Sequence, residues 1–471
     1  MAHLEPTSGR LDHLIGMEMT ERPDPARETR VVFSVVAVAA FGSLIALGLG
    51  MTFFADEWAF VEQRSLGDPS TWLTPHNEHW STLPILLYRA LVETVGIGSY
   101  VPYLGVVAVL HVLVAALAYL LLEHSSGPHL ALAGGVLVLF FGSGFENLYW
   151  GFQTGFIGSL ALGLAAMAVT DRGPTRFRVA IVAILLLAAV MCSTIGVIVA
   201  IAIGVEWVLD RRWRDAITAL VLPAVVLLVW LLTIGREGAL ARDPLTSEAL
   251  STVPLYVISG IGSAVGSVAG LPVIGGLLGL VFLVGIGIRL QAGVVASRAI
   301  GIVVAITVMY ILIGLARGLI ETDHSGLSRY TYVSGILALI ALGDVIGKAT
   351  LPATGRRRLV AISVTAIWLT LTTYHNGSLL ILGRELFLER ADMTRALVTV
   401  ALEPDPPPGA ELDRSLVLVP SPTSLRRIAA SYGDPRGDVV VPFAVRPIPP
   451  AVAVEATRRL IEGVPVPGVS D

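Results

Sequence analysis

Cysteine, lysine and charge are all scarce in this chain. Its single cysteine, Cys192, excludes an intramolecular disulfide and any cysteine-based zinc site. Only 14% of the 471 residues are charged, against about a quarter in an ordinary soluble domain. The net charge of -4 is small, and we expect no nucleic-acid partner. Lys348 is the only lysine, so contacts to phosphate have to come from arginine, which can bind phosphate with two parallel hydrogen bonds.

Apolar sequence dominates instead, with 54% hydrophobic residues and a mean hydropathy of +0.77. Runs near the spanning length of about 20 residues recur along the chain, which is typical of a polytopic membrane protein. We therefore predict an all-α fold with about eleven transmembrane helices. The spans are expected near 31–53, 101–122, 130–146, 154–170, 179–193, 195–209, 216–234, 273–289, 299–316, 331–347 and 359–375.

The placement of basic residues predicts the orientation of these spans. Four sets occupy alternate loops: Arg172, Arg176 and Arg178; Arg211, Arg212 and Arg214; Arg289 with Arg298; and Lys348 with Arg356, Arg357 and Arg358. The positive-inside rule makes these loops cytoplasmic. All four fall on one side only if the glycine-rich segment 252–272 does not cross, so we expect that segment to be re-entrant or interfacial. The N-terminus is then cytoplasmic and the C-terminus exoplasmic, in the plasma (inner) membrane of a bacterium.

We accordingly divide the chain into three parts. Residues 1–30 form a cytoplasmic tail, residues 31–375 form a transmembrane domain with an exoplasmic loop at 54–100, and residues 376–471 form an exoplasmic helix with a small tail domain. In the last part, 378–402 has an amphipathic helical pattern, 403–408 is a proline-rich linker and 416–419 is strand-like. A tight turn between two spans is expected at 192–196.

The exoplasmic loop carries the greatest density of chemical groups. Asp56 and Glu57 follow the first span directly, and His76, Glu78 and His79 come later in the same loop. A carboxylate there can act as general base toward an acceptor hydroxyl or hold a divalent cation, although a solvated helix end is the simpler alternative. On a helix the two histidines would share one face. With Asp56 they could build a metal site, but His-Asn-Glu-His does not have the spacing of the His-Glu-x-x-His motif, which favours hydrogen bonding to substrate or orientation of Asp56.

Aromatic residues accompany these polar groups. Trp58, Trp72 and Trp80 could form the apolar face on which a sugar stacks, or an interfacial aromatic belt, and the sequence leaves both interpretations open.

Two later outer segments add further candidates. Glu146, Asn147 and Gln153 lie in the second outer segment, where Glu146 is either a second functional carboxylate or a helix cap. Arg317 and Arg329, the latter followed by Tyr330, flank another outer loop. Because positive charge is disfavoured on that side of a membrane, we expect these arginines to bind a lipid phosphate.

With its polytopic array, its long first outer loop carrying Asp56 and Glu57, and its outer tail, the sequence resembles the GT-C superfamily of integral membrane glycosyltransferases. The resemblance implies an inverting transfer of a sugar from a polyprenyl-phosphate carrier to a cell-envelope glycan, lipid or protein. It implies Asp56 as the leading base with Glu57 beside it, and we place His79 with them as an orienting group. A divalent cation, Mg²⁺ or Mn²⁺, would be held by Asp56 and Glu146. The expected substrate-binding residues are His76, Glu78, Trp80, Glu146, Asn147, Gln153, Arg317, Arg329 and Tyr330.

Two other functional classes stay open. A transporter or lipid-linked-sugar flippase needs charged groups within its spans, and the sequence offers few, chiefly His111 and Glu206. A non-catalytic membrane assembly protein would use the acidic loop as a docking surface. The sequence has no P-loop and no Rossmann glycine motif, which fits a donor that is not a nucleotide.

Overall fold

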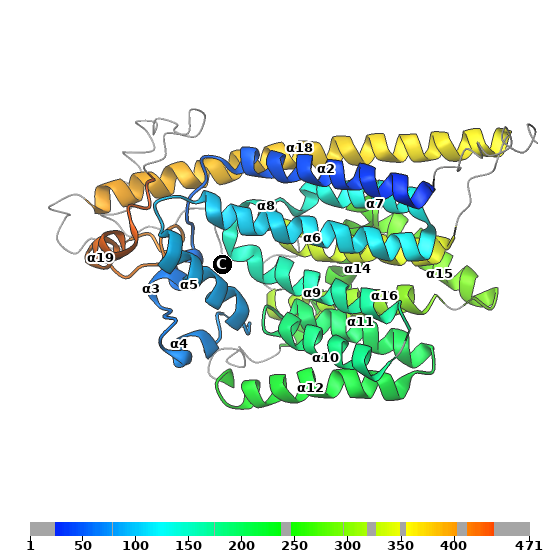
Figure 1. Ribbon diagram of the computed structural model, residues 1–471, viewed down its shortest axis with the longest axis horizontal. Coiled ribbons are helices and arrows are strands. Elements are labelled where there is room, and N and C mark those ends of the chain that lie inside the picture. Colours follow the sequence, from blue (N-terminus) through cyan, green and yellow to red (C-terminus); the bar gives the residue numbers. More distant parts are fainter. Residues whose placement is uncertain are drawn as a thin grey trace, which may run out of the picture.

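The computed structural model describes residues 24–77, 79–173, 175–236, 246–294, 296–317, 326–348, 355–402 and 412–437. Within these ranges the chain is helical and forms only isolated β-bridges. Figure 1 shows the long helices side by side in one bundle, with the short helices α3, α4, α5 and α19 at one end. We call that end the loop end. The predicted all-α fold is confirmed.

Eight of the described helices are long and apolar enough to cross a membrane. They are α2 (Pro25–Gly48), α6 (Val101–Ser126), α9 (Thr154–Thr170) with the preceding η2 (Gly151–Gln153), α12 (Trp213–Leu232), α14 (Ser247–Ala269), α15 (Gly275–Gln291) with the preceding η3 (Pro272–Ile274), α16 (Ser297–Arg317) and α17 (Ser328–Ile346). The protein is thus a multi-pass membrane protein.

The predicted span 130–146 is a bent pair rather than one straight helix. It consists of α7 (Pro128–Leu139), then η1 (Gly142–Gly144) and α8 (Phe145–Tyr149), with a bend of 40°. The bend leaves the Leu139 carbonyl without its usual helical partner. The ring of His111 compensates, because its Nε2 lies 3.2 Å from that oxygen.

The last expected span is part of a much longer helix, α18 (Arg356–Ala401). Its 46 residues extend about 69 Å, more than twice the hydrocarbon thickness of a bilayer. The span expected at 359–375 and the helix expected at 378–402 are therefore one element, and Asn376 is buried in its middle. Its amide donates to the Thr372 carbonyl and accepts the N–H of Ser143. The proposed domain boundary at 376 therefore falls inside one continuous helix.

Two other expected spans are short helices, α10 (Arg176–Val190) and α11 (Ile195–Leu209), of 15 residues each. The turn predicted between them at 192–196 is confirmed. At about 22 Å each they are shorter than a membrane's apolar core, so the count of eleven spans is not established.

Helix α14 is the segment predicted not to cross. By length and composition its residues 250–269 could span a membrane. Its neighbours nevertheless change along its length: Gly260 packs on Tyr310 of α16, and Ser267 lies against α17. Trp368 of α18 then donates to the carbonyl of Val268. Helix α14 thus packs within the bundle on α16, α17 and α18, and the expectation that it does not cross the membrane stays a prediction.

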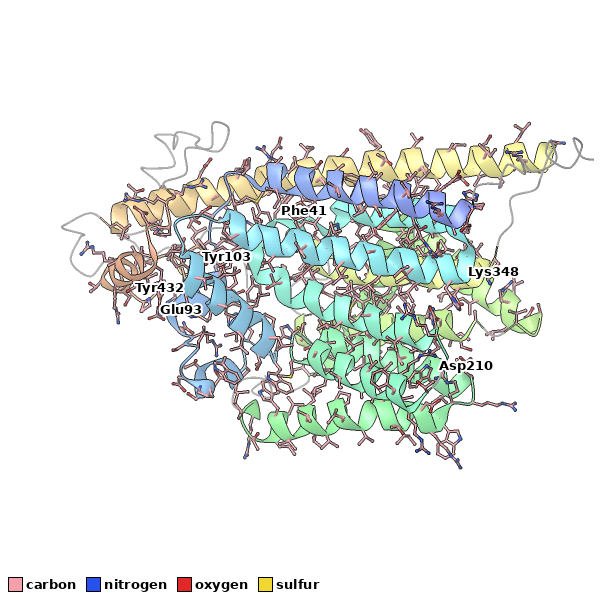
Figure 2. All side chains as sticks on the ribbon, viewed as in Figure 1. Phe41, Glu93, Tyr103, Asp210, Lys348 and Tyr432 are labelled. Atoms are coloured by element: carbon pink, nitrogen blue, oxygen red, sulfur yellow. The ribbon has the colours of Figure 1, made fainter. Side chains whose placement is uncertain are left out.

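The two ends of the bundle differ in chemistry. At the end opposite the loop end, Arg298 forms ion pairs with Asp171 and Glu206, the latter at 2.9 Å. Figure 2 shows Asp210 and Lys348 at that same end, and Glu93, Tyr103 and Tyr432 at the loop end. The charged turns that the sequence assigned to one side therefore lie opposite the acidic loop.

Candidate active site

The segment 54–100 is a packed structure with three short helices. These are α3 (Glu57–Glu62), α4 (Pro69–Leu73) and α5 (Thr82–Val95). Trp58 and Phe60 of α3 are almost completely buried, so Trp58 is not available for sugar stacking. The buried Arg64 donates to the Pro75 carbonyl at 3.0 Å and so fixes the approach to His76.

The C-terminal segment 412–437, which contains α19 (Pro422–Tyr432), packs onto both ends of this loop. Three hydrogen bonds join them: Ala55 N–H to the Leu416 carbonyl (2.9 Å), the Thr52 hydroxyl to the Pro435 carbonyl (3.1 Å) and Ile97 N–H to the Tyr432 carbonyl (2.8 Å). The predicted strand at 416–419 is reduced to one parallel bridge, between Val417 and Ala55. The tail thus forms part of the framework around the acidic pair.

Asp56 occupies the corner of a turn just before α3, eight residues after the end of α2. The preceding Ala55 has φ +46°, in the left-handed region that residues with a β-carbon rarely adopt. The Asp56 side chain is 27% exposed, and its Oδ1 lies 3.3 Å from Nε2 of His76 without the alignment of a hydrogen bond. Asp56 is therefore an accessible acid held in a defined backbone conformation.

His76 and His79 pair through their backbones and not on a helix. Each N–H donates to the other residue's carbonyl, at 3.1 and 3.0 Å, and Asn77 takes φ +50° at the turn between them. The prediction of a shared helical face is therefore wrong. Glu78 lies outside the described residues.

The rings of these histidines have different neighbours. The His76 ring is buried between Phe60 and Phe152, at centroid distances of 5.0 and 5.2 Å. The His79 ring lies 2.7 Å, by its Nδ1, from the hydroxyl of Thr194 in the turn between α10 and α11. His76 thus approaches Asp56, while His79 anchors the loop to the bundle.

Glu57 does not accompany Asp56 on the surface. Its side chain is completely buried and accepts hydrogen bonds from Phe54 N–H, Tyr88 and Tyr100. Burial raises the pKa of Glu57 to about 8, and these three hydrogen bonds oppose that rise. The structure therefore separates the predicted acidic pair into one accessible and one buried carboxyl group.

Glu146, Asn147 and Arg329 meet where α8 packs on the start of α17. The Arg329 N–H donates to Oε2 of Glu146 at 3.0 Å, and the Glu146 N–H donates to the Ser328 hydroxyl at 3.1 Å. The amide of Asn147 donates to the Arg329 carbonyl at 3.2 Å. Glu146 thus caps α17, the alternative that the sequence had left open.

Two guanidinium groups, those of Arg329 and Arg390, lie near the carboxylate of Glu146. Arg329 packs over the ring of Tyr330 at 5.4 Å, and both Glu146 and Asp56 act on it electrostatically. Arg390 of α18 lies near enough to Glu146 and Arg329 to be affected by both charges. Burial lowers the pKa of Arg390, and Arg329 adds to that effect. Within the described residues neither guanidinium has a carboxylate at salt-bridge distance.

Sequence reasoning did not identify Arg390. It lies in a stretch that has the pattern of an ordinary amphipathic helix. Because it is far from Asp56 along the chain, the sequence does not indicate that the two residues are close in space. In the structure its guanidinium stacks over Phe54 and Phe387, at 5.2 and 5.0 Å from the ring centroids. Only the fold brings residue 390 to the first loop.

Of the remaining predicted residues, Tyr330 lies in this cluster, under the Arg329 guanidinium, whereas Trp80 lies elsewhere in the loop. Trp80 stacks on Trp230, with centroids 5.0 Å apart and planes within 9°, so one of its faces is covered. Gln153 is 2% exposed and Tyr330 is 7% exposed. Arg317 ends α16, but its side chain lies outside the described part of the structure.

Comparison with known proteins identifies the architecture. No protein-family model and no curated protein matches the chain. Among solved structures, the crystal structure of ArnT from Cupriavidus metallidurans in the apo state matches with a TM-score of 0.51 and 14% identity, covering 93% of this chain and 91% of that one. The chain has the GT-C fold. At this identity the likeness concerns the fold, and it extends over nearly the whole of both chains.

The divalent cation expected from the sequence stays a prediction. Among the described residues, no three His, Cys, Asp or Glu side chains gather as a metal centre requires. Glu146, one of the two expected ligands, already accepts the Arg329 N–H. We assign no step of the reaction to a metal.

The two polar residues that suggested a transport pathway are paired within the bundle. His111 contacts the Tyr332 hydroxyl at 2.8 Å through Nδ1, in addition to the Leu139 carbonyl. Glu206 forms an ion pair with Arg298. Both residues therefore have structural partners, as buried polar groups generally do.

Proposed function

We propose that the protein is a membrane glycosyltransferase. It transfers a sugar from a polyprenyl-phosphate carrier to a hydroxyl group of a glycan, lipid or protein acceptor of the cell envelope, on the exoplasmic side. The observation that carries the proposal lies at the loop end of a GT-C fold: an accessible carboxylate, Asp56, follows the Phe54 ring on which Arg390 stacks, and Arg329 lies near enough to Asp56 to interact with its charge. A base and a set of phosphate ligands are what this reaction requires.

Asp56 is the base in this reaction. It takes the proton of the acceptor hydroxyl as that oxygen attacks the anomeric carbon from the side opposite the phosphate. The bond from the anomeric carbon to the phosphate oxygen breaks, its electron pair leaves with the polyprenyl phosphate, and the configuration of the sugar inverts. General base catalysis of this kind contributes roughly 10²–10⁴-fold in rate. His76, 3.3 Å away, limits the positions open to the Asp56 carboxylate.

Arg329 and Arg390 bind the phosphate and stabilise its charge as it leaves. They come from different helices, α17 and α18, and each is held in place by its own neighbours. The Glu146 cap fixes the backbone of Arg329, and the rings of Phe54 and Phe387 fix the guanidinium of Arg390. Such preorganised donors act at little reorganisation cost.

The direct test uses purified protein in lipid vesicles with an extract of cell-envelope acceptors. The donor probes are synthetic polyprenyl phosphates that carry a radiolabelled hexose, pentose or aminosugar. We expect one probe to yield free polyprenyl phosphate and labelled acceptor in equal amounts, and only when acceptor is present. Movement of the intact donor across the vesicle bilayer, with its sugar–phosphate bond preserved, contradicts the proposal and identifies a flippase.

A further inference from the structure

The carboxyl group of Glu57 is buried next to the proposed base and is surrounded by hydrogen-bond donors. Its Oε2 accepts the N–H of Phe54 at 2.8 Å. Its Oε1 accepts the hydroxyls of Tyr88 and Tyr100, at 2.9 and 2.7 Å. The side chain is 0% exposed, so neither oxygen is open to substrate. A fully buried carboxyl group is costly, and its presence here requires a structural or functional reason.

The first of these bonds closes the turn that contains Asp56. The Glu57 N–H also approaches the Phe54 carbonyl, at 3.2 Å, so Phe54 and Glu57 are joined on both sides of the turn. Between them lie Ala55, in its left-handed conformation, and Asp56. Because the backbone of Asp56 is enclosed by these bonds, the direction of its side chain depends on the Glu57 carboxyl group.

Tyr100 connects Glu57 to the second outer segment through a second hydrogen bond. The Tyr100 oxygen accepts the N–H of Gly151 at 2.7 Å while its proton goes to Glu57. A β-carbon on Gly151 would lie 2.6 Å from Oε1 of Glu57, so the chain passes directly over the carboxyl group. The next residue, Phe152, is the ring that packs on His76. One carboxyl group therefore links the Asp56 turn to the residues that hold His76.

We propose that Glu57 is a positioning residue, which aims Asp56 at the acceptor and joins the Asp56 turn to the second outer segment through Tyr100 and Gly151. The inference rests on the proposed role of Asp56 as base. It changes the role of Glu57 from a second catalytic carboxylate to a group that acts through its neighbour.

The chemistry of the site requires a carboxylate and not an amide. All three partners donate, so an ionised carboxylate satisfies each of them with an acceptor oxygen. In a Glu57→Gln variant one oxygen becomes an NH₂ group. If the NH₂ group faces Phe54, two N–H donors oppose each other. If it faces Tyr88 and Tyr100, the protons of their hydroxyl groups lose their acceptor. The amide is nearly isosteric, so packing is retained while the turn loses its closure.

The test measures kcat and donor KM separately in Glu57→Gln and Tyr100→Phe. We expect kcat of Glu57→Gln to fall on the order of 10²-fold, the cost of misplacing a reacting group by about 1 Å. Tyr100→Phe should lose about tenfold in kcat, the equivalent of one hydrogen bond. Donor KM should stay within about twofold in both, because the phosphate ligands are unchanged. Two matched controls should retain wild-type kcat: Tyr103→Phe, whose hydroxyl donates to the Gly96 carbonyl, and Glu62→Gln on the same short helix.

The pH profile of kcat separates positioning from simple loss of folded protein. The titratable groups facing Glu57 are Asp56 in its own turn, Tyr88 from α5, and Tyr100 and Tyr103 at the start of α6. The productive ionised form increases as pH rises through about 8, so wild-type kcat should rise there and that of Glu57→Gln should not. Unchanged kcat in Glu57→Gln, or identical profiles, overturns the inference. If Asp56→Asn is inactive in the same assay, the proposed function survives that outcome; if Asp56→Asn is also fully active, the proposed function fails as well.

Discussion

The guanidinium of Arg390 lies over the ring of Phe54, 5.2 Å from its centroid, and so meets the first outer loop two residues before Asp56. The last long helix of the chain thereby contributes to a site that begins at the end of the first one. Arg329, from α17, acts on the same region electrostatically. The positive charge at the site is therefore assembled from two late helices, whereas the acid comes from the first loop.

Removal of Arg390 should weaken use of the donor. Arg390→Ala eliminates a charge-assisted contact to the phosphate, worth on the order of 1.5–3 kcal/mol, or roughly 10–100-fold in kcat/KM. Arg390→Lys should recover only part, because the bidentate geometry is lost. The control is Arg414→Ala, whose side chain is exposed on the C-terminal segment. Equal donor kinetics in Arg390→Ala and Arg414→Ala would place phosphate binding elsewhere.

Substitution of Trp80 should affect stability and not sugar binding. Trp80 stacks on Trp230, which also donates to the Leu73 carbonyl at 2.8 Å, so the pair attaches the first loop to α12. Trp80→Ala should cost about 3–5 kcal/mol of stability, as truncation of a buried aromatic does, seen as a lower apparent melting temperature. Trp213→Ala, at an exposed tryptophan, is the control. A higher donor KM with an unchanged melting temperature would restore Trp80 as a sugar platform.

Much of the fold could be predicted from the sequence because apolar runs and arginine placement act over short distances along the chain. The segments 101–122 and 299–316 each fall on a described helix of spanning length, and 31–53 overlaps α2, which ends earlier, at Gly48. The separation expected between the span at 359–375 and the helix at 378–402 is absent, because α18 is continuous there. Asn376 is buried inside α18, where its side-chain amide donates to the Thr372 carbonyl and its oxygen accepts the Ser143 N–H.

The site was predictable only where chemistry and chain position coincide. Asp56 could be identified because an acid directly after a first span is unusual. The difference between Asp56 and Glu57 could not, since it arises from Tyr88 and Tyr100 closing around one carboxyl group and not the other. The hydrogen bond from the Ala55 N–H to the Leu416 carbonyl could not be predicted either, because it joins parts of the chain that are far apart in the sequence.

The buried Glu57 should also make stability depend on pH. Burial raises its pKa from 4.5 to about 8, so the folded protein retains a proton that the unfolded chain releases above about pH 4.5. This contribution to stability is complete below that pH and is lost as pH rises through about 8. The apparent melting temperature in detergent should therefore fall more between about pH 6 and pH 9 for wild type than for Glu57→Gln, which cannot titrate. Parallel curves would show that the folded-state pKa is not raised.

The measurement that tests the central claim most directly is the single-turnover rate of sugar transfer by Asp56→Asn in membranes, at saturating donor. The change is nearly isosteric, so insertion and packing are kept while the proton acceptor is removed. We expect the rate to fall at least roughly 10²–10⁴-fold, the usual contribution of a general base, with donor binding nearly unchanged. His76→Gln should fall between this variant and wild type, since His76 lies 3.3 Å from Asp56 and only limits its position. An Asp56→Asn protein that is expressed normally and transfers sugar at the wild-type rate would contradict the account.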